Sequence, residues 1–401
     1  MEIMRRIGEV DLLIENESAH ELYFEEGFLE KNGVTSPELS QIEICQLLSK
    51  NKFRPLYLMW ELLDKCNFSC PFCYIVGHSD NELIKFSEAK PQIDYLLEKG
   101  LLYCLLSGGE STIHPSFITI YKYLKNYGVI TEVYSNGAQL EEKHFELFRK
   151  YPPYKLEITI YGLSDKIFRK NTGSKYTAKT ILTNIMRMKE NGINVVCKTP
   201  VNSLTMVEFD EIQLWCKENN IKHYHSTDVS MSYDNDPLQQ YIAPKEIKIR
   251  YDTQNEIDFI KNFGKQENGQ VKTCFSCAVG SYGIHINSNF ELQPCSSFNG
   301  KMKGYNIRAL GIDKSLSLLC RHINSHLGNP ILGCFACDSS SYCKMCPALA
   351  EPVYKNDKVI GYKTNIEYCE NIRMIHKNIL INTREEAIQC DEACAGWSYG
   401  L

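Results

Sequence analysis

The chain has 401 residues, of which 43% are hydrophobic and 23% are charged, and its formal net charge is −5. This is the composition of an ordinary globular protein, and the length allows one large domain with one or two smaller ones. Lysine and arginine form no block along the chain, which argues against nucleic acid or an anionic membrane as a partner.

Cysteine is the residue type that departs most from an ordinary composition, with 18 in the chain. Disulfide scaffolds are usually small secreted chains, and this chain is not small. The segment Met1–Glu9 lacks the apolar core of a secretion signal, and no apolar run is long enough to span a bilayer. We therefore expect a cytoplasmic protein whose thiols bind metal.

Residues 1–52 form the first predicted segment. Strands are expected at Val10–Ile14 and His20–Glu25, and a helix at Ser36–Ser49 with Ser36 as its N-cap ahead of Pro37. The segment is either a cap on the domain that follows or a truncated peptide-binding module, and the sequence leaves both interpretations open.

Residues 53–235 alternate between strand and helix patterns. Strands are predicted at 56–63, 103–107, 130–135, 155–160, 194–200 and 221–227, with helices at 87–99, 115–127, 141–150, 176–191 and 205–219. Six strands alternating with helices predict an α/β fold whose parallel sheet is closed or curled into a barrel. A full barrel has eight such units, so the predicted barrel is partial.

Three cysteines follow the first of these strands, in the stretch Cys66-Asn67-Phe68-Ser69-Cys70-Pro71-Phe72-Cys73. Iron–sulfur cubanes are held by cysteine thiolates and usually take four, so this loop would leave one iron open to a small molecule. A zinc site would need a fourth ligand nearby, and the remaining alternative is three unrelated core cysteines. We favour the cluster.

The spacing C-x3-C-x-aromatic-C, with Phe72 as the aromatic residue, resembles the signature of radical S-adenosylmethionine (SAM) enzymes. The resemblance implies an open (β/α)6 barrel over residues 56 to about 227, with the chemistry at the carboxyl ends of the strands. It also implies that SAM chelates the open iron of a [4Fe–4S] cluster. One electron, from a donor such as flavodoxin or ferredoxin, then cleaves SAM to methionine and a 5′-deoxyadenosyl radical.

Further strand-end motifs match the same family. A SAM-binding set is therefore expected at Phe72, Gly108, Gly109, Glu110, Ser135, Asn136 and Arg169. Gly108, Gly109 and Glu110 look like the motif that binds the SAM amino group, and Arg169 like the arginine that meets the SAM carboxylate. Tyr161 stands where relatives usually have an aspartate, which leaves its role open.

A second group of cysteines follows a predicted linking helix in residues 236–270, at Pro244–Phe263. Eight cysteines within residues 271–372 are twice the number that one tetrahedral or cubane site needs; a pair of zinc ribbons is the alternative. The array resembles the SPASM domain of radical SAM enzymes. That resemblance implies two auxiliary [4Fe–4S] clusters, one on Cys274, Cys277, Cys295 and Cys346, and one on Cys334, Cys337, Cys343 and Cys369.

Two departures from the SPASM pattern affect the partition of these ligands. Only two residues separate Cys343 from Cys346, where the family has three, and Phe290 stands where the family has a glycine before Cys295. Residues 373–401 are expected to form a C-terminal tail that contains Cys390 and Cys394.

The predicted function is that of a radical SAM/SPASM maturase that abstracts hydrogen from a peptide, such as a ribosomally made precursor. The product would be a crosslink, a thioether, an epimer or an oxidised residue. Alternatives are a sulfatase-type formylglycine maturase, disfavoured because Ser296 replaces the expected aspartate, and a SPASM enzyme acting on a tetrapyrrole or another small molecule. A zinc-stapled binding protein is the alternative without catalysis. The sequence identifies neither the substrate, the bond formed nor a catalytic base.

Overall fold

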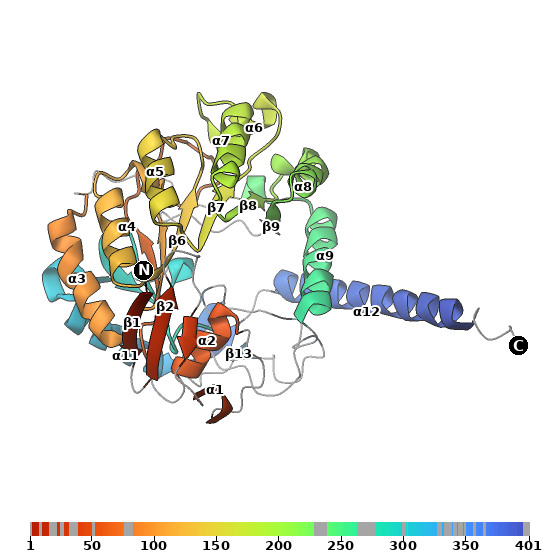
Figure 1. The fold of residues 1–401 in the computed structure, drawn as a ribbon. Coiled ribbons are helices and arrows are strands. Elements are labelled where there is room, and N and C mark those ends of the chain that lie inside the picture. The colour runs from red at the N-terminus through yellow and green to blue at the C-terminus, as the bar shows by residue number, and fades with distance from the viewer. Residues whose placement is uncertain are drawn as a thin grey trace, which may run out of the picture. The chain divides into compact units, whose positions relative to one another are not determined.

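The protein is described here by a computed structural model (Figure 1). The structure describes residues 2–7, 10–15, 22–24, 28–31, 39–49, 53–75, 83–227, 239–263, 277–298, 302, 304–326, 331–332, 339, 343, 348, 350–355, 358–363 and 366–395. The chain divides into two compact units. The first contains Met1–Ile242 and Phe275–Ser325, and the second contains Ala243–Cys274 and His326–Leu401.

The first unit is built on a nine-stranded sheet with the order β12-β11-β10-β4-β5-β6-β7-β8-β9. The six consecutive strands from β4 to β9 run parallel to one another. They are β4 (Tyr57–Glu61), β5 (Tyr103–Ser107), β6 (Ile130–Ser135), β7 (Lys155–Thr159), β8 (Val195–Pro200) and β9 (Lys222–Ser226). Each lies within or beside a predicted strand, and β9 is at one edge of the sheet. This confirms the predicted α/β fold with an open parallel sheet.

Helices connect these strands along one face of the sheet (Figure 1). They are α3 (Phe86–Lys99), α4 (Phe117–Asn126), α5 (Glu142–Lys150), α6 (Asp165–Thr172), α7 (Ala178–Glu190) and α8 (Phe209–Glu218), with short 3₁₀ turns η1 (Ser111–Ile113) and η2 (Thr205–Val207). In α4 the buried residues Phe117, Ile120, Tyr121 and Leu124 recur at helical spacing, which explains why this face packs on the sheet. Helix α6 was not predicted, because its sequence DKIFRKNT is mostly polar.

A hairpin from the cysteine-rich region extends the same sheet. Strand β10 (Gly283–Ile286) pairs in parallel with β4, β11 (Glu291–Gln293) pairs antiparallel with β10, and β12 (Tyr305–Asn306) forms the edge. The turn η4 (Ser296–Phe298) and helices α10 (Ile307–Leu310) and α11 (Ile312–His326) follow β11 and β12 respectively. The segment between Cys277 and Cys295 is therefore hydrogen-bonded directly to the strand that precedes the first cysteine loop.

Phe290, which is one of the two departures from the SPASM pattern, has a left-handed backbone and a buried side chain. Its φ is 59°, in the left-handed region that glycine adopts without strain. The side chain is 1% exposed, and its ring stacks 6.3 Å from that of Trp60, with the guanidinium of Arg308 5.4 Å from its centre. A glycine would avoid the strain of this backbone conformation, but it would lack the buried ring that packs on Trp60.

The N-terminal segment forms a small antiparallel sheet with the order β1-β2-β3, from β1 (Glu2–Ile7), β2 (Val10–Glu15) and β3 (Leu22–Phe24), followed by α1 (Phe28–Lys31) and α2 (Gln41–Leu48). Ile7, Leu12 and Cys45 belong to one buried cluster with Leu56 and Leu102, which precede β4 and β5. The segment thus covers the amino ends of barrel strands, the opposite ends from the cysteine loop.

The predicted start of the N-terminal helix was wrong. Helix α2 begins at Gln41, with Ser40 as its N-cap, and Leu39 lies outside the helix. Ser40 accepts a hydrogen bond from the backbone N–H of Glu43, whose carboxylate accepts from the backbone N–H of Ser40. This reciprocal capping box defines the helix start; Ser36 lies outside the described residues.

The second unit contains two long helices, α9 (Lys245–Phe263) and α12 (Ile366–Ala395), and a small sheet of β13 (Ile331–Leu332), β14 (Glu351–Lys355) and β15 (Lys358–Lys363). The helices share an isoleucine core that consists of Ile249, Ile257, Ile260, Ile372, Ile375 and Ile379. Lys245 and Glu370 form an ion pair at 3.7 Å. The predicted C-terminal tail is helical as far as Ala395, and its isoleucines recur at helical spacing where the helix packs on α9.

None of the described helices combines the length and the hydrophobicity that a membrane span requires. The turn η3 (Gln239–Tyr241) precedes α9 and belongs to the first unit.

Candidate cluster and cofactor site

The loop Cys66–Cys73 follows the carboxyl end of β4, and its three thiols lie near one another. Burial raises the pKa of the Cys66 thiol to about 12, and burial also raises that of Cys73. Burial raises the pKa of Cys70 well above its usual value, and the neighbouring Cys73 and Cys66 raise it further. Buried thiols with such high pKa values are poorly ionised alone, so a bound metal would supply the positive charge that their thiolates require.

Amide groups are directed at the sulfur of Cys66. The backbone N–H of Phe68 lies 3.4 Å from Sγ, and Nδ2 of Asn136 lies 3.5 Å from it. Asn136 also donates to Oδ1 of Asn67 at 2.6 Å. Asn136, at the end of β6, therefore fixes the loop that follows β4 and supplies the kind of hydrogen bond that tunes metal–thiolate centres.

The backbone of the loop is held by the stretch Asn171-Thr172-Gly173 at the end of α6. The N–H of Ser69 donates to the carbonyl of Thr172 at 2.7 Å. A Cβ on Gly173 would lie 3.0 Å from the carbonyl oxygen of Ser69, and Gly173 has a φ of 57°. The chain needs glycine here because both the conformation and the close approach disfavour a side chain.

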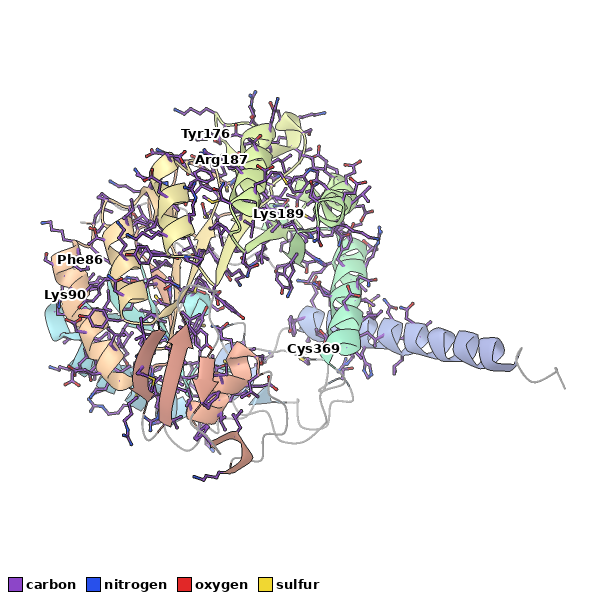
Figure 2. The ribbon with its side chains drawn as sticks, viewed as in Figure 1. Phe86, Lys90, Tyr176, Arg187, Lys189 and Cys369 are labelled. Carbon is purple, nitrogen blue, oxygen red and sulfur yellow. The ribbon has the colours of Figure 1, made fainter. Side chains whose placement is uncertain are left out.

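Aromatic rings surround Phe68 on the inner side of the loop. Its ring centre lies 5.6 Å from Phe168, 6.1 Å from Tyr161 and 6.2 Å from Tyr176. Tyr176, labelled in Figure 2, lies just before α7. Such edge and tilted contacts are favourable and hold the ring of Phe68, which is 3% exposed, in one orientation.

Gly108 and Gly109 follow β5 and lie against the chain leading into the cysteine loop. A Cβ on Gly108 would be 2.4 Å from the carbonyl oxygen of Leu63, and one on Gly109 would be 2.3 Å from that of Lys65. These glycines were predicted to let the backbone approach a ligand. The structure instead places the chain's own backbone beside them, and a role in binding SAM stays a prediction.

The carboxylate of Glu110 joins the ends of two strands. It is 2% exposed and accepts from the hydroxyl of Thr112 at 2.5 Å, from Ser135 Oγ at 2.9 Å and from the N–H of Asn136 at 2.6 Å. Burial raises the pKa of Glu110, and these hydrogen bonds act in the opposite direction. Glu110 therefore aligns Asn136 with the cysteine loop; its predicted contact with the SAM amino group stays a prediction.

The other predicted SAM contacts occupy different surroundings. Phe72 is half-buried, with its ring 6.1 Å from Tyr161 and 6.0 Å from Tyr241. The Arg169 side chain is 56% exposed on α6 and pairs with Asp165 at 3.8 Å. Of the predicted SAM contacts, Phe72 therefore lies in the cysteine loop, and the hydrogen-bonded Glu110, Ser135 and Asn136 lie beside it. The contact of Arg169 is a surface ion pair.

Tyr161 is a site residue whose role the sequence left open. It follows β7, contacts the rings of Phe68 and Phe72, and its side chain hydrogen-bonds to Cys70, which partly offsets the rise in the pKa of that thiol. The residue that departs from the family pattern is therefore in contact with a predicted cluster ligand.

A buried contact between Glu61 and His285, which the sequence did not predict, lies beside the end of the loop. Oε1 of Glu61 is 3.3 Å from Nε2 of His285 and accepts from the hydroxyl of Tyr74 at 3.1 Å. Both Glu61 and His285 are fully buried. Tyr74 directly follows Cys73, so this group connects β4, the cysteine loop and β10. A glutamate at the end of a buried strand was the sequence signal for this contact. Its partner His285 is 224 residues away, so no local pattern identifies the pair.

The predicted auxiliary ligands are described only in part. Cys277 is exposed and Cys295 is half-buried, one on each side of the β10–β11 hairpin. Cys343 is half-buried, as is Cys369, which lies in the first turns of α12 (Figure 2). Four of the proposed ligands, Cys274, Cys334, Cys337 and Cys346, lie outside the described residues. The partition between two clusters stays a prediction.

The donor set of the loop Cys66–Cys73 fits an iron–sulfur cluster. The thiols are close enough to raise one another's pKa, and amide hydrogens point at sulfur. Within the part of the chain that the structure describes, no group of three or more His, Cys, Asp or Glu is arranged to hold a single metal ion. A cubane differs from such a site because its thiolates bind different irons.

The model of the radical SAM superfamily matches residues 60–213, from the end of β4 into α8. The chain therefore contains a radical SAM domain, which its parallel sheet and the cysteine loop form. Proteins of this superfamily bind SAM and a [4Fe–4S] cluster, which are the two cofactors that the sequence predicted for the cysteine loop.

Two curated proteins show how far the similarity extends. The chain is 23% identical over 255 residues to the antilisterial bacteriocin subtilosin biosynthesis protein AlbA of Bacillus subtilis, which is 61% of this chain and 55% of AlbA. It is 27% identical over 178 residues to GTP 3′,8-cyclase of Haemophilus influenzae, 41% of this chain and 51% of the cyclase. The chain thus spans about half the length of these curated relatives.

Solved structures share the fold over more of the chain. SuiB of Streptococcus suis bound to S-adenosylmethionine has a TM-score of 0.61 at 16% identity, over 86% of this chain and 94% of SuiB. Native anSMEcpe with bound AdoMet and the Cp18Cys peptide has a TM-score of 0.60 at 13% identity, over 83% of this chain and 99% of that one. At these identities the likeness shows the fold.

Proposed function

We propose that this radical SAM enzyme is a SPASM-type maturase that modifies a peptide, such as a ribosomally made precursor. The observation that carries the proposal is the parallel ladder between β10 and β4. It makes the segment between Cys277 and Cys295 a continuation of the sheet that carries Cys66, Cys70 and Cys73. A second cysteine region built into the catalytic sheet is an arrangement suited to auxiliary clusters that serve the same reaction.

The relatives support a peptide as the substrate class. AlbA is a bacteriocin biosynthesis protein, SuiB has been solved with the precursor peptide SuiA, and anSMEcpe with the Cp18Cys and Kp18Cys peptides. The match to AlbA runs over 255 residues, against 178 for the GTP cyclase. Similarity beyond the shared catalytic sheet therefore favours a peptide-modifying enzyme over a nucleotide cyclase.

Each group of residues in the site has a separate role in this proposal. Cys66, Cys70 and Cys73 would hold the cluster, and the bound cluster and SAM together supply a 5′-deoxyadenosyl radical that removes a hydrogen atom from the substrate. Asn136 orients the loop through Asn67 and through Cys66 Sγ. The aromatic rings packed around Phe68 would keep water from that side of the loop, and this would protect a reactive intermediate.

The auxiliary cysteines would hold two further [4Fe–4S] clusters, for three in all. If all eight are ligands, each auxiliary cluster has four thiolates and no open iron for substrate. Electron transfer or structural support is then their role. A flavodoxin or a ferredoxin is the proposed electron donor.

The proposal is tested by anaerobic co-expression with each short open reading frame beside the gene. Mass spectrometry should detect a peptide that has lost hydrogen or, for an epimer made in D2O medium, a peptide that has gained deuterium. The Cys70→Ala variant is the matched control and should return the peptide unmodified. SAM cleavage without modification of any peptide, together with turnover of a sulfatase or a small molecule, would overturn the peptide assignment.

A further inference from the structure

A group of charged side chains lies on the face of the sheet that the helices leave uncovered. Ile158 of β7 points toward α7, because Gly137 lies between its side chain and that of Ile181. Side chains alternate along a strand, so Glu157 and Thr159 point to the opposite face. Lys155 of the same strand points to this face as well. Strand register adds Glu132 and Tyr134 of β6, Lys198 of β8 and Tyr224 of β9.

Lys155 is the central cation of this group. Its Nζ lies 3.2 Å from Oε2 of Glu132 and 3.5 Å from Oε2 of Glu157, and the two glutamate side chains are 5% and 6% exposed. Burial lowers the pKa of Lys155, but the two carboxylates outweigh it and raise the pKa above its usual value. Buried carboxylates require such pairing, so Lys155 has a structural role.

Lys198 differs from Lys155 in its exposure and in its contacts. Its side chain is 40% exposed, and Nζ lies 3.8 Å from Oε1 of Glu157, beyond hydrogen-bond distance. The ammonium also lies 5.7 Å from the ring centre of Tyr134. An ammonium has three donors, so Lys198 retains hydrogen-bonding capacity toward an incoming group.

The position of Lys198 connects it to the cysteine loop. Thr159 is its register partner on β7, and Tyr161, two residues further along the chain, contacts Phe72 and Cys70. On the other side the register partner is Tyr224, which is 43% exposed. A group bound to Lys198 would therefore lie at the carboxyl ends of the strands, the same edge of the sheet as the predicted cluster ligands.

We propose that Lys198 anchors a carboxylate of the peptide substrate, with Tyr134 and Tyr224 flanking it. The proposal rests on the peptide function proposed above. A carboxylate within hydrogen-bond distance of the ammonium would form the charge-assisted bond that Glu157 at 3.8 Å does not form. An acidic side chain fixed at this point would orient the neighbouring residue of the peptide toward the cluster site.

Selection from a random peptide library displayed on mRNA tests the proposal, with the immobilised anaerobic holoenzyme and SAM. The parent protein should enrich peptides that have Asp or Glu at one position. Lys198→Glu should reduce that enrichment about tenfold and select Lys or Arg there instead, whereas Lys198→Arg should preserve it. Lys179→Glu, an exposed lysine on α7, is the matched control and should behave as the parent.

The outcomes distinguish the two proposals. Peptides enriched without an acidic preference, or the same preference in Lys198→Glu, would overturn the role of Lys198 and leave the peptide function standing. No enrichment by any variant would overturn the peptide function and this role with it. Retention by Lys198→Arg together with loss in Lys198→Glu separates a charge effect from a folding defect.

Two further measurements identify the source of the carboxylate. Synthetic copies of an enriched peptide with an amidated C-terminus should bind as the free acid does, since the proposal assigns the contact to an acidic side chain. The dissociation constant for SAM should be unchanged in Lys198→Met. A tenfold weaker affinity for SAM in that variant would assign Lys198 to the SAM carboxylate and overturn the proposal.

Discussion

Oε1 of Glu61 lies 3.3 Å from Nε2 of His285, and both side chains are completely buried. The pair joins β4 to β10, the strand between Cys277 and Cys295, and the hydroxyl of Tyr74 completes it beside Cys73. The contact therefore connects the cysteine loop to the segment that holds two predicted auxiliary ligands.

Removing one partner of this pair should destabilise the first unit. We expect His285→Ala to lower the free energy of unfolding by about 3 kcal/mol, because it removes one of the two groups beside Oε1 of the buried Glu61 and leaves a cavity in the core. The double variant Glu61→Leu/His285→Leu should lose less, since it removes both polar groups and fills their space with apolar side chains. Anaerobic thermal melting measures both, and a single variant as stable as the parent would contradict the assigned pairing.

Gly109→Ala should disturb the cysteine loop. Its Cβ would lie 2.3 Å from the carbonyl oxygen of Lys65, so the segment leading to Cys66 must move. We expect loss of the electron paramagnetic resonance signal of the cluster on Cys66, Cys70 and Cys73. Gly192→Ala is the control, because it places its Cβ in open space, although its φ of 77° costs about 1 kcal/mol. Equal signals in the two variants would contradict this account of Gly109.

Tyr161→Phe should make the reduction potential of this cluster more negative. The side chain of Tyr161 hydrogen-bonds to Cys70, and hydrogen bonds to the sulfur ligands help set the reduction potential of such clusters. A redox titration followed by electron paramagnetic resonance gives the potential. Tyr176→Phe serves as the control, since that ring contacts Phe68. A potential identical in Tyr161→Phe and the parent would exclude this hydrogen bond as a determinant.

His114 should make stability depend on pH. Burial lowers its pKa from 6.5 to about 4, so the folded protein holds it neutral. Its stabilising contribution is complete above pH 6.5, where the unfolded chain is also neutral, and is lost as pH falls toward 4. Between pH 7.5 and 5.5 the parent should lose about 1 kcal/mol more than His114→Gln. Denaturant titrations at the two pH values measure this difference, and equal losses would contradict a neutral buried His114.

The sequence predicted most of the catalytic sheet because its strands are buried apolar runs separated by amphipathic helices. Strands β5 and β6 have the predicted limits, and β4 lies within its predicted range. Helix α6 escaped prediction because only Phe168 among its apolar residues is buried. The start of α2 was displaced because Ser36 before Pro37 and the capping box of Ser40 are competing N-terminal signals, and the structure uses Ser40.

The site was predictable as a set of residues but not as a set of contacts. The spacing of Cys66, Cys70 and Cys73 is sufficient to predict a metal site. The bond from Asn136 to Asn67 depends on how two strand-end loops meet, and no local pattern encodes it. For Phe290 the sequence indicated a departure from the family. Its left-handed backbone and its packing on Trp60 depend on the tertiary structure and could not be predicted from local sequence.

Reductive SAM cleavage tests the central claim most directly. The anaerobically reconstituted protein should form 5′-deoxyadenosine from SAM, and it should contain about twelve irons if three cubanes are present. Cys70→Ala should abolish 5′-deoxyadenosine formation while retaining the iron of the auxiliary clusters, because two thiolates cannot hold a cubane with an open iron. A Cys70→Ala variant that still cleaves SAM at a rate near that of the parent would contradict the assignment of the cysteine loop.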